Sequence, residues 1–173
     1  TGIWSITAGS LSAGAATGTS HSITIVATDP AGNVSSASSA LTVTIDITAP
    51  NAPASLDLEA ASDSGTNTDN ITNDTTPDIS GSAENSSTVI LYDLVSGSAV
   101  ASIGTATAHS STGAWTVTPS TALSAPGTTG IAHSLWASAT DVAGNTSATS
   151  TALSITVDST APATPSTPDL DAA

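Results

Sequence analysis

Acidic side chains are the groups in this sequence best suited to chemistry. The chain has 14 Asp and Glu residues, no Lys, no Arg and a formal net charge of −14. Carboxylate oxygens are the ligands that hard divalent cations such as calcium prefer. A nucleic acid would find no basic side chain to neutralise its phosphates, and an anionic membrane surface would repel the chain. The composition therefore predicts cations as partners and excludes nucleic-acid binding.

One motif with an acidic residue occurs twice. Asp-x-Ala-Gly-Asn stands at residues 29–33 and again at 141–145. Asp and Asn favour turns, and Gly32 and Gly144 can adopt the positive φ that a tight hairpin needs. For Asn33 and Asn145, turn geometry is the interpretation that we prefer to calcium ligation.

Other reactive groups are sparse. Cysteine is absent, which excludes disulfides and thiolate metal sites. His21 and His133 lack a Cys, His or Glu at ligand spacing, so we expect both to be solvent-exposed at the entry of a strand. The sequence has no Gly-x-Ser-x-Gly nucleophile motif and no Gly-rich phosphate loop, so we expect no enzymatic activity.

The beginning of the sequence predicts a fragment of a longer protein. Residues 1–4 do not resemble a signal peptide and lack an initiator Met, and no stretch approaches the roughly 20 apolar residues of a membrane helix. We therefore expect no membrane insertion.

Internal repetition is the clearest organising feature. The segment 27–35 matches 139–147, and 41–50 matches 153–162, both at an offset of 112 positions. This register predicts the C-terminal part of a first repeat at 1–48, a complete repeat at 49–160 and the start of a third at 161–173.

Short strands with alternating apolar residues fill the complete repeat. Leu153, Ile155 and Val157 alternate with small polar residues, which is typical of a half-buried strand. Turn residues separate about seven such segments, so the fold class is all-β, with tandem antiparallel β-sandwiches. The expected strands are 56–58, 76–81, 88–92, 103–108, 114–118, 134–139 and 153–157.

The three Trp residues predict two environments. Trp4 and Trp115 occupy equivalent positions, each with an aliphatic residue two positions on, and are predicted to anchor the core. Trp136 is out of phase with Leu135 and is predicted to face outward, as a partly covered surface residue or an interaction residue.

These segments resemble a known family. Residues 139–147 with 153–162 resemble the C-terminal hairpin, and 57–65 with 68–77 the opening, of bacterial Ig-like repeats in biofilm-associated and RTX-type, type I secreted adhesins. The resemblance implies an immunoglobulin-like topology, secretion to the bacterial cell surface, calcium dependence and an arrangement of repeats in series.

Placed on that topology, the carboxylates gather at two poles. Asp63, Asp69, Asp74 and Asp158 would converge at the C-terminal pole of the complete repeat. At its N-terminal pole, Glu84, Asp141 and Asn145 would face Asp46 of the preceding repeat. Neighbouring carboxylates repel each other by about 1 kcal/mol per pair at 4 Å in water. A calcium ion bound between them makes the net interaction attractive. The hypothesis is calcium at each junction; the alternative is that these acids are solvated residues that cap turns.

The resulting prediction is a structural extender, a stalk repeat of a surface adhesin that supports cell adhesion and biofilm formation. Its partners would be neighbouring repeats of the same chain, with surface glycans or other adhesin chains as further possibilities. One alternative is a module that binds carbohydrate or protein through Trp136 or Tyr92. Another is an accessory β-sandwich of a secreted polysaccharide-degrading enzyme.

Overall fold

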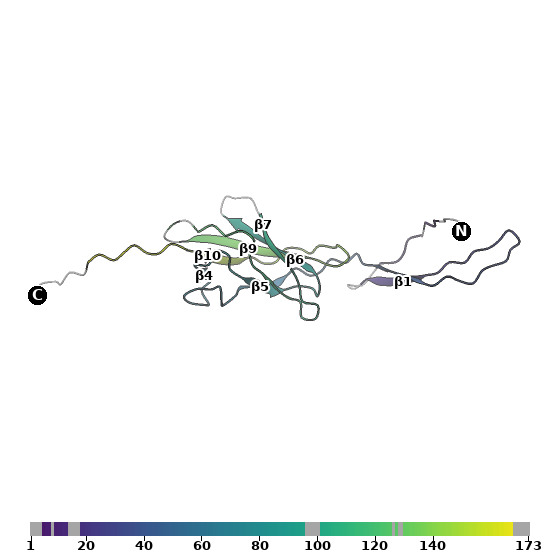
Figure 1. The fold of residues 1–173 in the computed structure, drawn as a ribbon, viewed down its shortest axis with the longest axis horizontal. Coiled ribbons are helices and arrows are strands. Elements are labelled where there is room, and N and C mark those ends of the chain that lie inside the picture. The colour runs from purple at the N-terminus through teal and green to yellow at the C-terminus, as the bar shows by residue number, and fades with distance from the viewer. Residues whose placement is uncertain are drawn as a thin grey trace, which may run out of the picture.

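The computed structural model describes residues 5–7, 9–13, 18–95, 101–125, 127 and 130–167. In this part of the chain every regular element is a β-strand. Figure 1 shows a sandwich with a long hairpin projecting from one end and the C-terminal segment leaving from the other. The all-β prediction is confirmed.

Two sheets form the sandwich. The five-stranded sheet has the order β4 (Ile71–Thr72), β10 (Leu153–Val157), β9 (Ile131–Thr140), β6 (Thr88–Val95) and β7 (Ala101–Thr107). The three-stranded sheet has the order β3 (Ala54–Leu58), β5 (Ile79–Ser82) and β8 (Ala114–Val117). Neighbouring strands are antiparallel, except that β4 runs parallel to β10.

Alternation along the strands builds the core. On β9, Leu135, Ala137 and Ala139 have no exposed surface, and Ile155 and Val157 of β10 are equally covered. Because successive side chains of a strand point to opposite faces, these positions all face the other sheet. That sheet and the loops supply Leu58, Ile79, Ala108, Trp115, Val117 and Leu123, while Val89 and Leu91 come from β6 and Ile103 comes from β7.

Trp115 is the large anchor of this core, as predicted, with 3% of its surface exposed. Its ring lies on Gly81 of the neighbouring strand β5, to which it is paired. A Cβ atom at position 81 would lie 2.5 Å from the Trp115 ring, so the indole occupies the space that a side chain there would fill. Trp4 lies outside the described residues.

β4 was not predicted from the sequence. It is two residues long, too short to show an alternation, yet Thr72 is buried and β4 covers the outer edge of β10. The Thr156 N–H donates to the Asn70 carbonyl and the Asp158 N–H to the Thr72 carbonyl, both at 2.8 Å. A short element therefore protects a sheet edge that would otherwise be open.

The N-terminal hairpin repeats the last strands of the sandwich. β1 (Thr19–Ile23) and β2 (Leu41–Ile45) form a two-stranded antiparallel sheet of their own. These strands correspond to β9 and β10 at the offset of 112. The burial differs, because Ile155 and Val157 are covered by the second sheet, whereas the hairpin unit leaves large apolar side chains exposed, namely Ile6, Val26, Val34, Leu41 and Ile47.

Most expected strands are found with shifted ends. The prediction for 153–157 is confirmed in both bounds, and the others differ by a few residues. β9 begins at Ile131, so His133 lies within the strand and not before it. The same holds for His21 in β1. No helix in the described residues is long and apolar enough to cross a membrane.

Candidate functional site at the two poles

The loop 141–145 at the N-terminal pole is held by its own acidic residue. Asp141 Oδ1 accepts hydrogen bonds from the backbone N–H groups of Ala143 (2.8 Å) and Asn145 (2.9 Å). Asp141 Oδ2 accepts one from Asn145 Nδ2 at 2.8 Å. Gly144 has a φ of +95°, which confirms the predicted tight turn. Both carboxylate oxygens of Asp141 therefore stabilise the loop itself.

The loop 29–33 has the same construction. Asp29 Oδ1 accepts from the backbone N–H groups of Ala31 and Asn33, each at 2.9 Å, and Asp29 Oδ2 accepts from Asn33 Nδ2 at 2.8 Å. In each loop the side-chain hydrogen bond from Asn is the largest influence that lowers the pKa of the Asp carboxyl below its usual value. The backbone N–H groups add to the effect because they also favour the charged form.

The loop 141–145 reaches the chain that precedes the sandwich. Asn145 Nδ2 also donates to the Asp46 carbonyl oxygen, at 3.2 Å. Glu84, which is solvent-exposed, lines a shallow hollow with the linker residues Asn51 and Ala52. The structure therefore places Glu84, Asp141 and Asp46 at one end of the sandwich, where the linker enters.

The linker residues are packed against this end. Pro50 and Pro53 are both buried, although the residues between them are exposed. The Asp46 carboxylate caps the turn into the linker, since its Oδ1 accepts from the Thr48 N–H at 3.0 Å. Fixed proline φ angles and buried rings leave this connection little freedom.

The other four predicted residues lie at the C-terminal pole. Asp69 and Asp158 line the same shallow hollow, while Asp63 is buried and its Oδ2 accepts from the Asn70 N–H at 3.3 Å. Asp74 Oδ1 accepts from the Thr76 N–H at 2.8 Å. Hydroxyl-bearing and amide side chains share the hollow with the two acids, namely Ser64, Thr66, Thr72, Asn73 and Thr160.

The donors at this pole are all oxygens. Asp63 Oδ1 is buried and has no hydrogen-bond partner, so one carboxylate oxygen is left unsatisfied. Within the described ranges, no three His, Asp or Glu side chains converge closely enough to hold a metal ion by themselves. A cation here would take Asp69 and Asp158 together with hydroxyl, carbonyl and water oxygens, which is the chemistry that calcium accepts.

Comparison with known proteins defines the family. A family model described as a bacterial Ig-like domain matches residues 49–159. This chain belongs to that family. One solved structure, described as a tetra-tandem repeat in the extending region of a large adhesion protein, is similar over 84% of this chain, with 20% identity and a TM-score of 0.44. This chain spans 33% of that one, and similarity at this level is too low to carry over its properties. A search of curated proteins finds no match.

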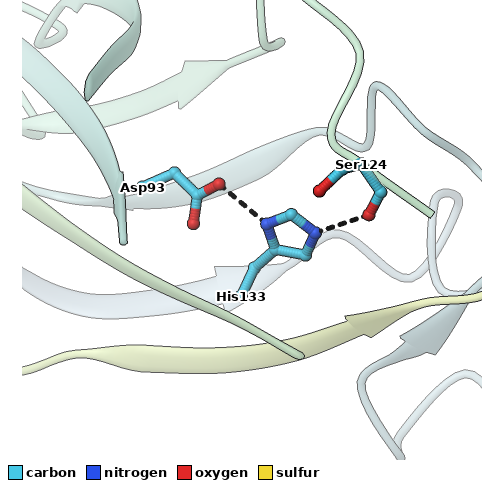
Figure 2. Close-up of polar contacts among 3 residues, drawn as sticks. All are labelled: Asp93, Ser124 and His133. Carbon is cyan, nitrogen blue, oxygen red and sulfur yellow. Dashed lines mark hydrogen bonds and ion pairs between the residues drawn. The ribbon is translucent and has the colours of Figure 1, made fainter. Parts of the chain in front are cut away.

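The Ig-like domain contains a buried His–Asp pair that the sequence analysis missed. His133 is 1% exposed and Asp93 6%, and His133 Nδ1 lies 2.7 Å from Asp93 Oδ2. Figure 2 shows the imidazole between this carboxylate and the Ser124 carbonyl, which lies 2.9 Å from Nε2. A carbonyl only accepts, so Nε2 carries a hydrogen, and another lies between Nδ1 and Oδ2.

The prediction that His133 is exposed was wrong. The alternation along each strand could have revealed the pair. His133 lies two positions before the buried Leu135, and Asp93 two positions after the buried Leu91, so both side chains point into the core. The arrangement does not activate a nucleophile, because the imidazole contacts the carbonyl of Ser124 and not its hydroxyl. The same contact recurs in the hairpin unit, where His21 Nε2 lies 2.8 Å from the Ser12 carbonyl.

Trp136 and Tyr92 form a stacked pair on the outer face of the five-stranded sheet. Their ring centroids are 4.3 Å apart and the planes differ by 18°. The two residues are directly opposite each other on β9 and β6, and both are half-buried. The prediction that Trp136 faces outward is confirmed.

Proposed function

We propose that this Ig-like domain is an extender unit in a stalk on the surface of a bacterium. The observation that carries the proposal is the repetition of one design along a single direction. Loop 29–33 and loop 141–145 share their hydrogen bonds, and β1–β2 repeats β9–β10. The chain enters the sandwich at one pole and leaves at the other (Figure 1). Units joined in this way add length without adding new chemistry.

The proposed division of the chain follows the repeat. Residues 1–48 belong to one unit, 49–160 form a complete unit, and 161–173 begin the next. The buried prolines Pro50 and Pro53 support a stiff connection, since a linker packed on the sandwich cannot swing freely. The proposed location is extracellular, with cell adhesion and biofilm formation as the processes that the stalk would serve.

Replacement in the native full-length protein tests the extender role. Residues 49–160 are deleted in frame, which removes one period, or replaced by an unrelated sandwich of similar length. We expect the deletion to leave export intact and to shorten the stalk, measured by electron microscopy, and the unrelated sandwich to restore length and adhesion. Adhesion that only the original sequence restores would contradict an extender and favour a binding module.

We propose further that calcium stiffens the junctions. The support is the excess of 14 acids with no Lys or Arg, the shared hollow of Asp69 and Asp158, and the unsatisfied Asp63 Oδ1. The other predicted ligands would be peripheral to the bound calcium. Hydrogen bonds within their own turns hold the carboxylates of Asp46, Asp74 and Asp141, and Glu84 is exposed.

Differential scanning calorimetry of the full chain tests this proposal. We expect millimolar calcium to raise the melting temperature above that in chelator, because an ion that binds only the folded state stabilises it. Asp158→Asn should reduce that rise, whereas Asp57→Asn, an exposed acid on β3 that lines neither hollow, should not. Equal melting temperatures with calcium and chelator would contradict the proposal.

A binding role is the second candidate, favoured by the outward Tyr92–Trp136 pair. Aromatic faces bind the apolar faces of sugars and of protein partners. Titration with surface glycans, followed by tryptophan fluorescence, would support this role if the signal saturates in the wild type and not in Tyr92→Ala.

A further inference from the structure

The contact between Asn145 and Asp46 joins two units of the repeat. Asn145 Nδ2 donates to Asp141 Oδ2 at 2.8 Å and to the Asp46 carbonyl at 3.2 Å. These residues are 99 positions apart, on opposite sides of the linker. We infer that the Asp-x-Ala-Gly-Asn loop is a docking clasp whose ligand is the main chain that follows the last strand of the preceding unit.

The loop is pre-formed for this role. Asp141 holds the backbone of loop 141–145 through two N–H groups and fixes the Asn145 amide through one of its two hydrogens. The other hydrogen is thereby aimed outward, at the Asp46 carbonyl. A donor that is already oriented loses little freedom on binding, so even one hydrogen bond can select a position for the neighbour.

The donor end of the clasp recurs in the preceding unit. Asn33 Nδ2 donates to Asp29 Oδ2 at 2.8 Å, within a loop that repeats each hydrogen bond of loop 141–145. Asn33 is therefore equipped to take the main-chain carbonyl of a unit before it.

The acceptor end recurs as well. Asp46 and Asp158 cap their turns in the same way, with Thr48 and Thr160 N–H groups 3.0 Å from Oδ1. Gly18 and Gly130 approach these strand ends so closely that an added Cβ would lie 3.0 Å from the Asp46 Cβ and 2.9 Å from the Asp158 Cβ. The Asp158 main chain is thus shaped as the Asp46 main chain is.

Each unit therefore has a donor loop at its N-terminal pole and an acceptor at its C-terminal pole. Surfaces that differ at the two ends make a heterologous, head-to-tail contact, which propagates along a chain of identical units. The partner that fits this surface is another copy of the same repeat, joined through a short linker. This inference deepens the proposed extender function by naming what sets one unit's position on the next.

Distance measurements on the full chain test the clasp. The protein has no Cys, so Thr42→Cys on β2 and Thr116→Cys on β8, both exposed, provide two spin-label sites. Double electron–electron resonance, in chelator to exclude calcium, then reports the spread of distances between the hairpin and the sandwich. We expect Asn145→Ala to broaden the spread and lower the docked-to-undocked ratio about fivefold, the effect of a net hydrogen bond of about 1 kcal/mol.

Asn33→Ala is the matched control. It removes the same side chain from the same loop, so it should leave the distance distribution unchanged, and circular dichroism checks that both variants fold. Unchanged distances in Asn145→Ala, or equal broadening in Asn33→Ala, would overturn the clasp. Either result would leave the extender function standing, because that function is tested by replacement of the unit in the native protein.

Discussion

The buried pair of Asp93 and His133 shows how single residues specify this core. Each ring nitrogen of His133 has an oxygen partner, whereas Asp93 Oδ1 has none. A buried polar group that loses its hydrogen-bond partner keeps its full desolvation cost, so removing one member costs more than the pair contributes. The recurrence of the His21–Ser12 contact indicates that the histidine is part of the repeat's design.

Asp93→Ala should therefore destabilise the domain. We expect the free energy of unfolding to fall by about 3 kcal/mol, because breaking a buried pair leaves the imidazole without its partner. Urea denaturation measures the change. Asp57→Ala, at an exposed position, is the control and should change stability by less than about 0.5 kcal/mol. Equal effects of the two substitutions would show that the pair is unimportant.

The loop aspartates predict a response to acid. Hydrogen bonds from Asn33 and Asn145 lower the pKa values of Asp29 and Asp141 below 3.8. A lowered folded pKa means that the stabilisation is present above the unfolded value and is lost as the pH falls through the folded one. Both loops should therefore keep the hydrogen bonds to their Asp carboxylates at pH 5 and lose them as the pH falls below about 3.8.

Carbon-detected NMR titration of the side-chain carboxyls measures these two pKa values. Asn145→Ala should raise the midpoint of Asp141 and leave that of Asp29 unchanged, and Asn33→Ala should do the reverse. A midpoint of Asp141 that does not respond to Asn145→Ala would contradict the assigned cause.

At the scale of elements, sequence patterns located strands well where alternation was long. β10 was predicted in both bounds, because Leu153, Ile155 and Val157 face one side without interruption. β4 has only two residues and owes its conformation to its neighbour β10, which no local pattern reveals. His133 was predicted to lie before the strand because it is polar. Its burial depends on a hydrogen bond to Asp93 on β6, a residue 40 positions away that no local pattern reveals.

The candidate site could be predicted in outline only. The repeat and the assumed topology brought Asp46 and Asp141 to one junction, and the Asn145–Asp46 contact lies there. The side-chain directions depended on turn geometry, which uses the Asp141 oxygens within the loop. Sequence alone could not distinguish a carboxylate that caps its own turn from one that faces a neighbour.

The close packing of β5 on β8 gives a prediction at the same scale. In Gly81→Ala the added methyl group would meet the Trp115 ring, which is already fully packed, so we expect a loss of about 1–3 kcal/mol in unfolding free energy. Thermal and chemical denaturation measure it. Gly9→Ala has no atom within 4 Å of the new Cβ and should be neutral; a neutral Gly81→Ala would mean that the sheet can shift.

At the scale of the whole molecule, equivalent strands differ in protection. β10 packs under the second sheet, with Val157 fully buried, whereas the equivalent Ile45 of β2 is only half-buried. Local opening is easier where few apolar contacts hold a strand. We expect the amides of β2 to exchange with deuterium faster than those of β10, as measured by hydrogen exchange and mass spectrometry. Equal protection of the two strands would contradict this view of the hairpin.

The parallel pairing of β4 with β10 has a mechanical consequence. The linker leads into β3 at one pole and the chain leaves beyond Asp158 at the other, so in the proposed stalk tension would reach β4 once β3 is pulled away from β5. It would then pull β4 and β10 in opposite directions along their length. The hydrogen bonds from the Thr156 and Asp158 N–H groups then carry the load together, in shear, and neither can open before the other. The smallest strand of the fold thus lies between the two ends at which a stalk would be pulled, and its hydrogen bonds resist the separation of those ends.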